Sequence, residues 1–191
     1  MILAVDVGNS NTTVGLFNGT GELLFRALLE TSRSKTRDQC AIELLGVFQL
    51  YGADACTVDG AILSSVVPPL TTIFTDAIAR LTGIPPMVVG PGIRTGLNIK
   101  AEIHNQLGSD IVASSVAAIA KYPSPIVMVD MGTATSLSLI VGSVYEGCII
   151  MPGLALALDA LSERAAALPP ISIETASPVG LMGHTTEEAM R

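Results

Sequence analysis

Hydrophobic positions divide the first part of the chain into a strand meander and a helix. Apolar runs at 2–6, 12–17 and 22–29 are separated by short polar turns, which predicts three antiparallel strands. From 38 to 51 the apolar residues instead recur every three or four positions, at Ile42, Leu44, Leu45, Phe48 and Leu50. This second spacing predicts a helix.

The middle of the chain adds alternating strands and helices. The pattern predicts a buried strand over 58–67, a helix over 70–81, a short strand over 87–89 and a helix over 110–121. Pro68-Pro69 ends the first strand, and Ser109 is expected to be the N-cap of the last helix.

The strand pattern restarts after Pro123-Ser124-Pro125. Strands are expected at 126–130, 137–141 and 144–150, followed by a helix over 154–167 and a last helix from Thr185 or Thr186. The same order on both sides predicts an α/β chain made of two similar halves, 1–122 and 125–191. Because the last helical pattern is still in progress at Arg191, we expect the second half to be truncated and the natural polypeptide to be longer.

Each half opens with the same kind of loop, in which an aspartate closes an apolar run and glycine and small polar residues follow. The first loop consists of Asp6, Val7, Gly8, Asn9, Ser10, Asn11, Thr12 and Thr13, and the second of Asp130, Met131, Gly132, Thr133, Ala134, Thr135 and Ser136. Glycine lets backbone N–H groups approach an anion closely, and hydroxyl and amide side chains add donors. Aspartate can hold a cation that bridges phosphate oxygens. The loops therefore predict a phosphate site.

Each aspartate could instead be only a solvated carboxylate at a strand end. A charge inside an otherwise apolar strand is unfavourable unless it binds something, so we prefer the binding interpretation for both Asp6 and Asp130.

Composition narrows the classes of function. Hydrophobic residues make up 49% of the chain and charged residues only 14%, so we expect a partner subunit to cover apolar surface. The net charge of −7, with ten Lys and Arg spread thinly, argues against a nucleic-acid groove. No apolar stretch approaches the ~20 residues of a membrane span, and no basic segment opens a signal peptide. A cytoplasmic protein that binds neither membrane nor nucleic acid is expected.

The remaining reactive and charged side chains predict no further site. The three cysteines lie far apart without metal-ligand spacing and are expected to be buried free thiols: Cys40, Cys56 and Cys148. His104 and His184 are isolated histidines, and Arg33, Lys35 and Arg37 are interpreted as a solvated basic cluster in a loop.

The repeated order of elements resembles the duplicated ribonuclease-H-like architecture of actin, the sugar kinases and the heat-shock chaperone ATPases. In that fold a nucleotide lies in the cleft between the two halves, and each half supplies one phosphate loop. The resemblance implies a nucleotide-binding α/β fold but does not by itself assign a reaction.

Six segments, in order and at matching spacing over essentially the whole chain, resemble type III pantothenate kinase. They are Asp6-Val7-Gly8-Asn9-Ser10-Asn11-Thr12, Ser64-Ser65-Val66-Val67-Pro68-Pro69, Thr95-Gly96-Leu97-Asn98-Ile99, Val129-Asp130-Met131-Gly132-Thr133-Ala134-Thr135, Gly147-Cys148-Ile149-Ile150-Met151-Pro152-Gly153 and Gly183-His184-Thr185-Thr186-Glu187-Glu188-Ala189-Met190. The resemblance implies ATP-dependent phosphorylation of pantothenate to 4′-phosphopantothenate, the first step of coenzyme A biosynthesis.

The resemblance also implies cofactors and roles on the ATP side. The loop from Asp6 to Thr13 would hold the phosphates, with Mg²⁺ bound to Asp6 through them. Gly132 and Thr133 would contact ATP, and Asp130 would hold a monovalent cation, K⁺ or NH₄⁺. The family is a homodimer whose acceptor sites lie at the subunit interface.

The acceptor side departs from the family pattern. The family has Gly-Ala-Asp-Arg where this chain has Gly108, Ser109, Asp110 and Ile111. The Asp that acts as the base in the family is therefore kept as Asp110, and the Arg that holds the pantothenate carboxylate is replaced by Ile111. Ala101 replaces an aromatic residue that lines the pantothenate pocket. Asp110 alone would be explained by the helix dipole. Thr186, which matches a threonine that reaches the acceptor, would equally be explained as an N-cap.

Two alternatives to a pantothenate kinase follow from these departures. A divergent paralogue would bind nucleotide but phosphorylate another alcohol, or would be a non-catalytic regulator. A structural actin-like module is disfavoured because both loops keep their polar residues.

Overall fold

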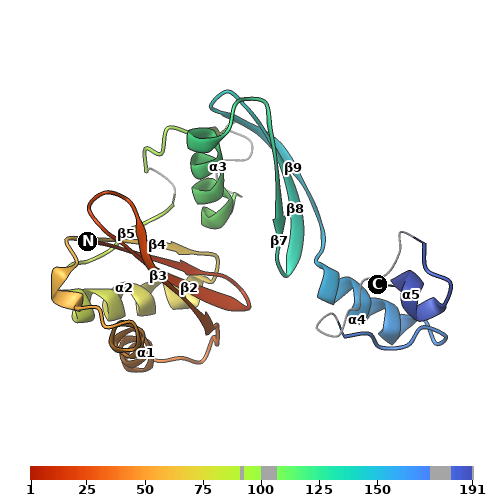
Figure 1. Cartoon of the computed structure of the whole chain (residues 1–191), viewed down its shortest axis with the longest axis horizontal. Coiled ribbons are helices and arrows are strands. Elements are labelled where there is room, and N and C mark those ends of the chain that lie inside the picture. Colours follow the sequence, from red (N-terminus) through yellow and green to blue (C-terminus); the bar gives the residue numbers. More distant parts are fainter. Residues whose placement is uncertain (91–92, 100–106, 173–181, 191) are drawn as a thin grey trace.

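The computed structural model of the chain describes residues 1–90, 93–99, 107–172 and 182–190 (Figure 1). Its first sheet has the strand order β3-β2-β1-β4-β5. The members are β1 (Ile2–Val7), β2 (Asn11–Phe17), β3 (Leu23–Glu30), β4 (Gly60–Ser65) and β5 (Met87–Val88). β1, β2 and β3 form the predicted antiparallel meander, and β4 runs parallel to β1.

Two helices cover one face of this sheet, α1 (Arg37–Leu50) and α2 (Pro68–Thr82) (Figure 1). Alternate residues of β1 point toward them, and Leu3, Val5 and Val7 are buried. Leu44 of α1 and Phe74 of α2 complete the same core. The predicted strand meander and the two helices therefore form the core of the first half.

Local chemistry explains where these helices begin. Thr36 caps α1 in a capping box with Gln39. Pro68 and Pro69 form the first turn of α2, where a missing N–H is tolerated. The predicted strand over 58–67 is shorter than expected, because a 3₁₀ turn (Ala55–Thr57) precedes β4 and the prolines start a helix rather than only ending a strand.

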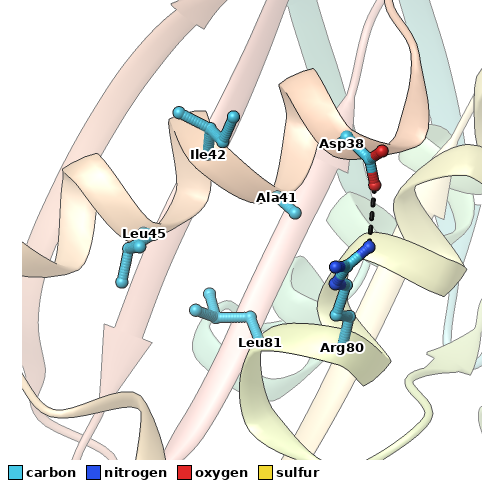
Figure 2. Close-up of a pocket in the computed structure, with 6 residues that line it drawn as sticks. All are labelled: Asp38, Ala41, Ile42, Leu45, Arg80 and Leu81. Atoms are coloured by element: carbon cyan, nitrogen blue, oxygen red, sulfur yellow. Dashed lines mark hydrogen bonds and ion pairs between the residues drawn. The ribbon is translucent and has the colours of Figure 1, made fainter.

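A shallow apolar groove runs between the two helices on the outside of the molecule. Figure 2 shows Arg80 of α2 paired with Asp38 of α1, at 2.8 Å, at one end of this groove. Ala41, Ile42 and Leu45 of α1 line it together with Leu81 of α2. Because α1 has apolar residues on both of its faces, burial and exposure can be compared within one helix.

The second sheet has the order β6-β9-β8-β7, formed by β6 (Asn98–Ile99), β7 (Ile126–Met131), β8 (Ala134–Val141) and β9 (Val144–Pro152). β7, β8 and β9 repeat the antiparallel meander of β1, β2 and β3. β6 was not predicted. Its two residues pair in parallel with β9, so a segment of the predicted first half joins the sheet of the second half.

The helix α3 (Ser109–Lys121) lies between the two sheets and contacts both β4 and β7. Beyond β9, α4 (Leu154–Arg164) and α5 (Thr186–Met190) lie at the far end of the molecule (Figure 1). Within the described residues, no helix has the length and apolar character needed to cross a bilayer.

One face of the second sheet is apolar and open. Every second residue of β7 contributes to it, and Val127, Val129 and Met131 are 65%, 54% and 73% exposed. Ile149 and Met151 of β9 are exposed as well. The uncovered apolar area expected from the low charge content is therefore located on this sheet.

The cysteines are free, as predicted, but only Cys40 is buried. Cys56 and Cys148 are exposed, so the prediction of three buried thiols was wrong for these two. Cys56 lies in the 3₁₀ turn and Cys148 on β9, and neither position could be assigned from hydrophobic periodicity.

We expect Leu44→Ala to lower the free energy of unfolding by about 2–5 kcal/mol, because Leu44 is fully buried and the truncation leaves a cavity. Ile42→Ala, two residues away in the same helix and 69% exposed, should change it by no more than about 0.5 kcal/mol. Urea unfolding of both variants checks this. Equal losses would contradict the orientation of α1.

Candidate functional site

The two glycine loops meet at their tips. The hydroxyl oxygens of Ser10 and Thr133 lie 2.9 Å apart, although 123 residues separate them in the chain. Both residues are exposed, as is Asn9 beside them. Since a hydroxyl both donates and accepts, these groups can turn from each other to an anionic ligand. The structure thus brings the two predicted phosphate loops to one place.

The aspartates of the two loops occupy equivalent positions. Asp6 of β1 is paired with Thr13 of β2, and Asp130 of β7 is paired with Ser136 of β8. Each carboxylate therefore stands near the end of a strand, beside a hydroxyl on the neighbouring strand. This equivalence is the duplication predicted from the sequence.

Backbone hydrogen bonds shape the two turns. The N–H of Gly8 donates to the carbonyl of Asn11, and the N–H of Gly132 donates to the carbonyl of Ala134, both at 3.0 Å. A Cβ at Gly8 would lie 3.0 Å from the Asn11 carbonyl oxygen, which is tighter than side chains normally tolerate. Glycine at this position keeps the turn compact.

A third glycine supports the second loop from behind. Gly153, the residue after β9, donates its N–H to the carbonyl of Thr133 at 3.0 Å. A Cβ at this position would overlap the carbonyl oxygens of Gly132 and Thr133. The close approach requires glycine, which gives a structural reason for this residue in the Pro-Gly segment.

Asp6 is the most perturbed carboxyl group of the site. Burial raises the pKa of Asp6 above its usual value, and a hydrogen bond with Ser64 offsets part of the rise. The negative charges of Asp110 and Asp130 raise this pKa further. The three carboxylates are therefore close enough to interact, although they come from β1, α3 and β7.

A cleft of about 380 Å³ separates α3 from the open face of the first sheet. Asp6, Thr13 and Ser64 line it from the sheet. Asp110 lines it from α3, next to the small side chains that this helix presents: Ala113, Ser114 and Ala117. The cleft combines an apolar wall with two carboxylates and hydroxyl groups, which suits a small polar molecule.

The N-terminus of α3 is attached to the first sheet. The hydroxyl of Ser109 accepts a hydrogen bond from the Ser65 N–H at 3.0 Å and lies 3.1 Å from the Ser64 hydroxyl. Gly108 occupies the N-cap position, so the prediction of Ser109 as N-cap was wrong by one residue. The hydroxyl of Ser109 instead fixes the position of the next residue, Asp110, relative to Asp6.

α3 also reaches the second sheet. Burial, opposed in part by a 2.9 Å hydrogen bond with Ser138, raises the pKa of Tyr145 on β9 to about 12, and Cys148 and Asp110 contribute to this rise. Asp110 thus lies within electrostatic reach of both sheets.

The side chains of several other predicted site residues are not placed to contact a ligand in the cleft. The side chains of Val7 and Thr12 are buried beneath the first loop, and only their backbones can face a ligand. Ile111 is half-buried in the first turn of α3 and donates its N–H to Asp110 at 2.7 Å. Ala101 lies outside the described residues.

Thr186 is not near Asp110. It begins α5, which lies at the far end of the molecule from α3 (Figure 1). The helix is capped by Thr185, whose hydroxyl accepts from the Glu188 N–H at 3.1 Å. An N-cap role therefore belongs to Thr185 rather than to Thr186.

The described residues hold no group of three or more His, Cys, Asp or Glu side chains arranged to bind a metal directly. A magnesium ion bound mainly by phosphate oxygens needs only one or two carboxylates from the protein. Asp6 and Asp130, each beside a glycine loop, fit that requirement, because a cation would offset the repulsion between them.

Two serines of the site belong to a segment that carries the family resemblance, but no role of their own was predicted for them from the sequence. Ser64 bonds to Asp6 and Ser109, and Ser65 holds the start of α3. Two adjacent serines at the end of an apolar strand were the available signal, because hydroxyls in that position must find partners once buried.

Comparison with known proteins adds a family. A model of the type III pantothenate kinase family matches residues 2–191. The chain is 41% identical to a type III pantothenate kinase of Geobacillus sp. (strain WCH70) and 40% identical to one of Exiguobacterium sp. (strain ATCC BAA-1283 / AT1b). Both alignments cover 100% of this chain, with 73% and 74% of the respective relatives.

Solved structures show the fold. A Campylobacter jejuni protein described as a Baf family transcriptional activator aligns with a TM-score of 0.54 at 20% identity, over 98% of this chain and 71% of its own. A Sinorhizobium meliloti protein described as a 2-dehydro-3-deoxygalactonokinase aligns with a TM-score of 0.53 at 13% identity, over 86% and 57%. The fold is that of the actin and sugar-kinase group, as predicted.

We expect Asp6→Asn to stabilise the protein at neutral pH. A carboxyl whose pKa is raised by folding contributes stability below its unfolded pKa of 3.8, and this contribution is lost as pH rises through the folded value. The difference in unfolding free energy between variant and wild type should therefore grow from about pH 4 to pH 7. Asp76→Asn, at an exposed position on α2, controls for the loss of a charge. A variant less stable than wild type at pH 7 would contradict the assignment.

Proposed function

The chain belongs to the type III pantothenate kinase family, and we propose that it transfers the γ-phosphoryl group of ATP to the primary hydroxyl of pantothenate. The product is 4′-phosphopantothenate, the first intermediate on the route to coenzyme A. The observation that carries the proposal is the contact between the two glycine loops at Ser10 and Thr133, with Asp6 of the first loop and Asp110 of α3 lining one cleft.

The nucleotide is assigned to the two loops. The backbone and side chains from Asp6 to Thr13 surround its phosphates, with Gly132 and Thr133 opposite. The exposed hydroxyls of Ser10 and Thr133, 2.9 Å apart, support this assignment because they belong to different halves. Residues 1–122 and 125–191 act as the two halves that enclose the nucleotide.

Two cations are assigned to the carboxylates of the loops. Asp6 binds magnesium through the phosphates, and Asp130 binds a monovalent cation, K⁺ or NH₄⁺. Bound cations neutralise charge that develops on the transferring group. Burial is the main cause that raises the pKa of Asp6, and the charges of Asp110 and Asp130 raise it further; these two neighbouring carboxylates support the assignment, since they make the site favourable for positive charge.

We assign the binding of the acceptor hydroxyl to Asp110, together with Gly108 and Ser109 beside it. Its carboxylate accepts the hydroxyl proton and orients the oxygen toward the γ-phosphorus. Because the transition state of phosphoryl transfer is loose, positioning and fixed charges contribute more than the strength of the base. The hydrogen bonds that tie Ser109 to β4 support this role, as they hold Asp110 in place.

One observation favours a second candidate function. Ile111 stands where the family has an arginine, and Ala101 where it has an aromatic residue. An isoleucine offers no partner for a carboxylate, and arginine is its best partner. A divergent paralogue that keeps ATP but takes another alcohol, or regulates without catalysis, would show these changes.

We expect purified protein to turn over ATP with pantothenate in the presence of Mg²⁺ and K⁺, with a raised KM for pantothenate. The missing charge-assisted bond is worth ~1.5–3 kcal/mol, which is about ten- to a hundredfold in affinity. Ile111→Arg, alone or with Ala101→Tyr, should lower that KM while leaving the KM for ATP unchanged. Asp6→Asn and Asp110→Asn should abolish turnover.

Each other outcome has a meaning. ATP binding without turnover in wild type and Ile111→Arg would favour the non-catalytic paralogue. If the wild-type enzyme is saturated at a low pantothenate concentration, another basic group must bind the pantothenate carboxylate. Arg26, which lines the same cleft, is a candidate. Full activity of Asp6→Asn would remove the first loop from the mechanism.

A homodimer is the proposed assembly. Apolar surface remains uncovered on the second sheet, and the half-buried residues Ile111, Val112, Val116 and Ile119 of α3 are a candidate contact. Thr186 lies far from Asp110 within one chain, so a partner subunit would have to supply it to the acceptor site.

We expect sedimentation at micromolar concentration to give a dimer. If Thr186 completes the partner's site, Asp110→Asn and Thr186→Ala should each be inactive or impaired alone, and mixing them should restore activity, because the mixed dimer has one intact site. A monomer would contradict the assembly. A dimer without restored activity would place Thr186 outside the acceptor site.

A further inference from the structure

Arg33 lies beside the first glycine loop. Its guanidinium donates to the Asn9 side-chain oxygen at 3.4 Å, and the side chain is exposed. The sequence grouped Arg33 with Lys35 and Arg37 as a solvated cluster. The structure separates the three, because each is directed to a different partner.

The other two cations of this segment have acidic partners. Lys35 forms a 2.9 Å ion pair with Glu43 and donates to the Glu30 carbonyl, and Arg37 lies 3.6 Å from Asp38. No carboxylate of the described residues pairs with Arg33. A guanidinium that is held near the loop without a counter-charge is available for an anionic ligand.

The segment that carries Arg33 is fixed to the loop. The N–H of Thr31 donates to the carbonyl of Ser10 at 2.9 Å, and the hydroxyl of Thr31 lies 2.8 Å from that of the buried Thr12. These bonds hold the backbone two residues before Arg33 against the loop. The side chain is therefore positioned by the same structure that positions Asn9 and Ser10.

The negative charges near the first loop favour a cationic group such as a guanidinium. Asp110 and Asp130 are close enough for their negative charges to act on Asp6, and a polyphosphate would bring further negative charge. Backbone N–H groups and bound cations offset part of this repulsion. A guanidinium adds a fixed positive charge whose planar donors match phosphate oxygens.

We propose that Arg33 binds the phosphate chain of ATP at the first loop and positions it for transfer. The inference rests on the proposed function, since it takes ATP to be the ligand of the loops. It adds a residue from the 31–36 segment to a site otherwise built from the two glycine loops and α3.

The test is Arg33→Gln, with Arg37→Gln as the matched control. Both variants remove one exposed positive charge from the same segment, but only Arg33 contacts the loop. Arg33→Gln should raise the KM and the Kd for ATP about ten- to a hundredfold, leave the KM for pantothenate within twofold, and leave the melting temperature unchanged. Arg33→Lys should recover part of the loss, because it keeps the charge but not the planar fork.

An Arg33→Gln variant with a wild-type Kd and KM for ATP would overturn the inference, as would equal losses in Arg37→Gln. The inference and the proposed function fail separately. If Arg33→Gln is neutral while Asp6→Asn abolishes turnover, only Arg33 is excluded. If wild type does not phosphorylate pantothenate, calorimetric titration of ATP into both Arg variants still decides the role of Arg33.

Discussion

The site depends on a fold that holds three carboxylates near one another against their mutual repulsion. Asp6, Asp110 and Asp130 come from β1, α3 and β7, and the negative charges of the latter two raise the pKa of Asp6. Such an arrangement persists only where the surrounding fold over-determines it. Here the constraint is supplied by elements that have no charge themselves: the parallel pairing of β1 with β4, the hydrogen bonds of Ser109, and the contact of Ser10 with Thr133. A bound cation would reduce this repulsion, so the arrangement favours cation binding.

The sequence predicted the parts of this arrangement that rest on short-range pattern. Apolar runs separated by turns located β1 to β3 and β7 to β9. The Asp-x-Gly loops located both halves of the site, because a charge at the end of an apolar strand is visible without any knowledge of the fold. The predictions that were missed or wrong concern features that tertiary contacts determine. β6 has two residues and no periodicity, and it exists because β9 accepts it as a neighbour. Ser109 looked like a cap, but its hydroxyl is taken by β4, so Gly108 holds that position. Arg33 read as solvated because nothing local distinguishes it from Lys35, whose partner Glu43 lies on the following helix.

The sheets of the two halves are covered by helices to different extents. The first sheet has α1 and α2 on one face and α3 across part of the other, and its core side chains are close to fully buried. The second sheet repeats the meander, but the face that carries Val127, Val129 and Met131 has no helix over it in the described part of the chain. An apolar strand face of this kind is unfavourable in water. The loop of this sheet that contacts the first glycine loop nevertheless keeps its shape, because Gly153 and Gly132 fix it through backbone contacts.

The departure at Ile111 affects only one end of the site. The phosphate end keeps Asp6, both glycine loops and the residues that tie them together, and Arg33 adds a cation there. The proposed acceptor end keeps Asp110, which lines the cleft with Asp6 and the small residues of α3, and Arg26 is the basic residue among those described that line the cleft. A negatively charged acceptor approaching Asp110 would therefore meet net repulsion unless Arg26 or a partner subunit supplied a cation. In the proposed function, the chemistry of phosphoryl transfer and the recognition of the acceptor thus depend on separate residues, and Ile111 bears only on the second.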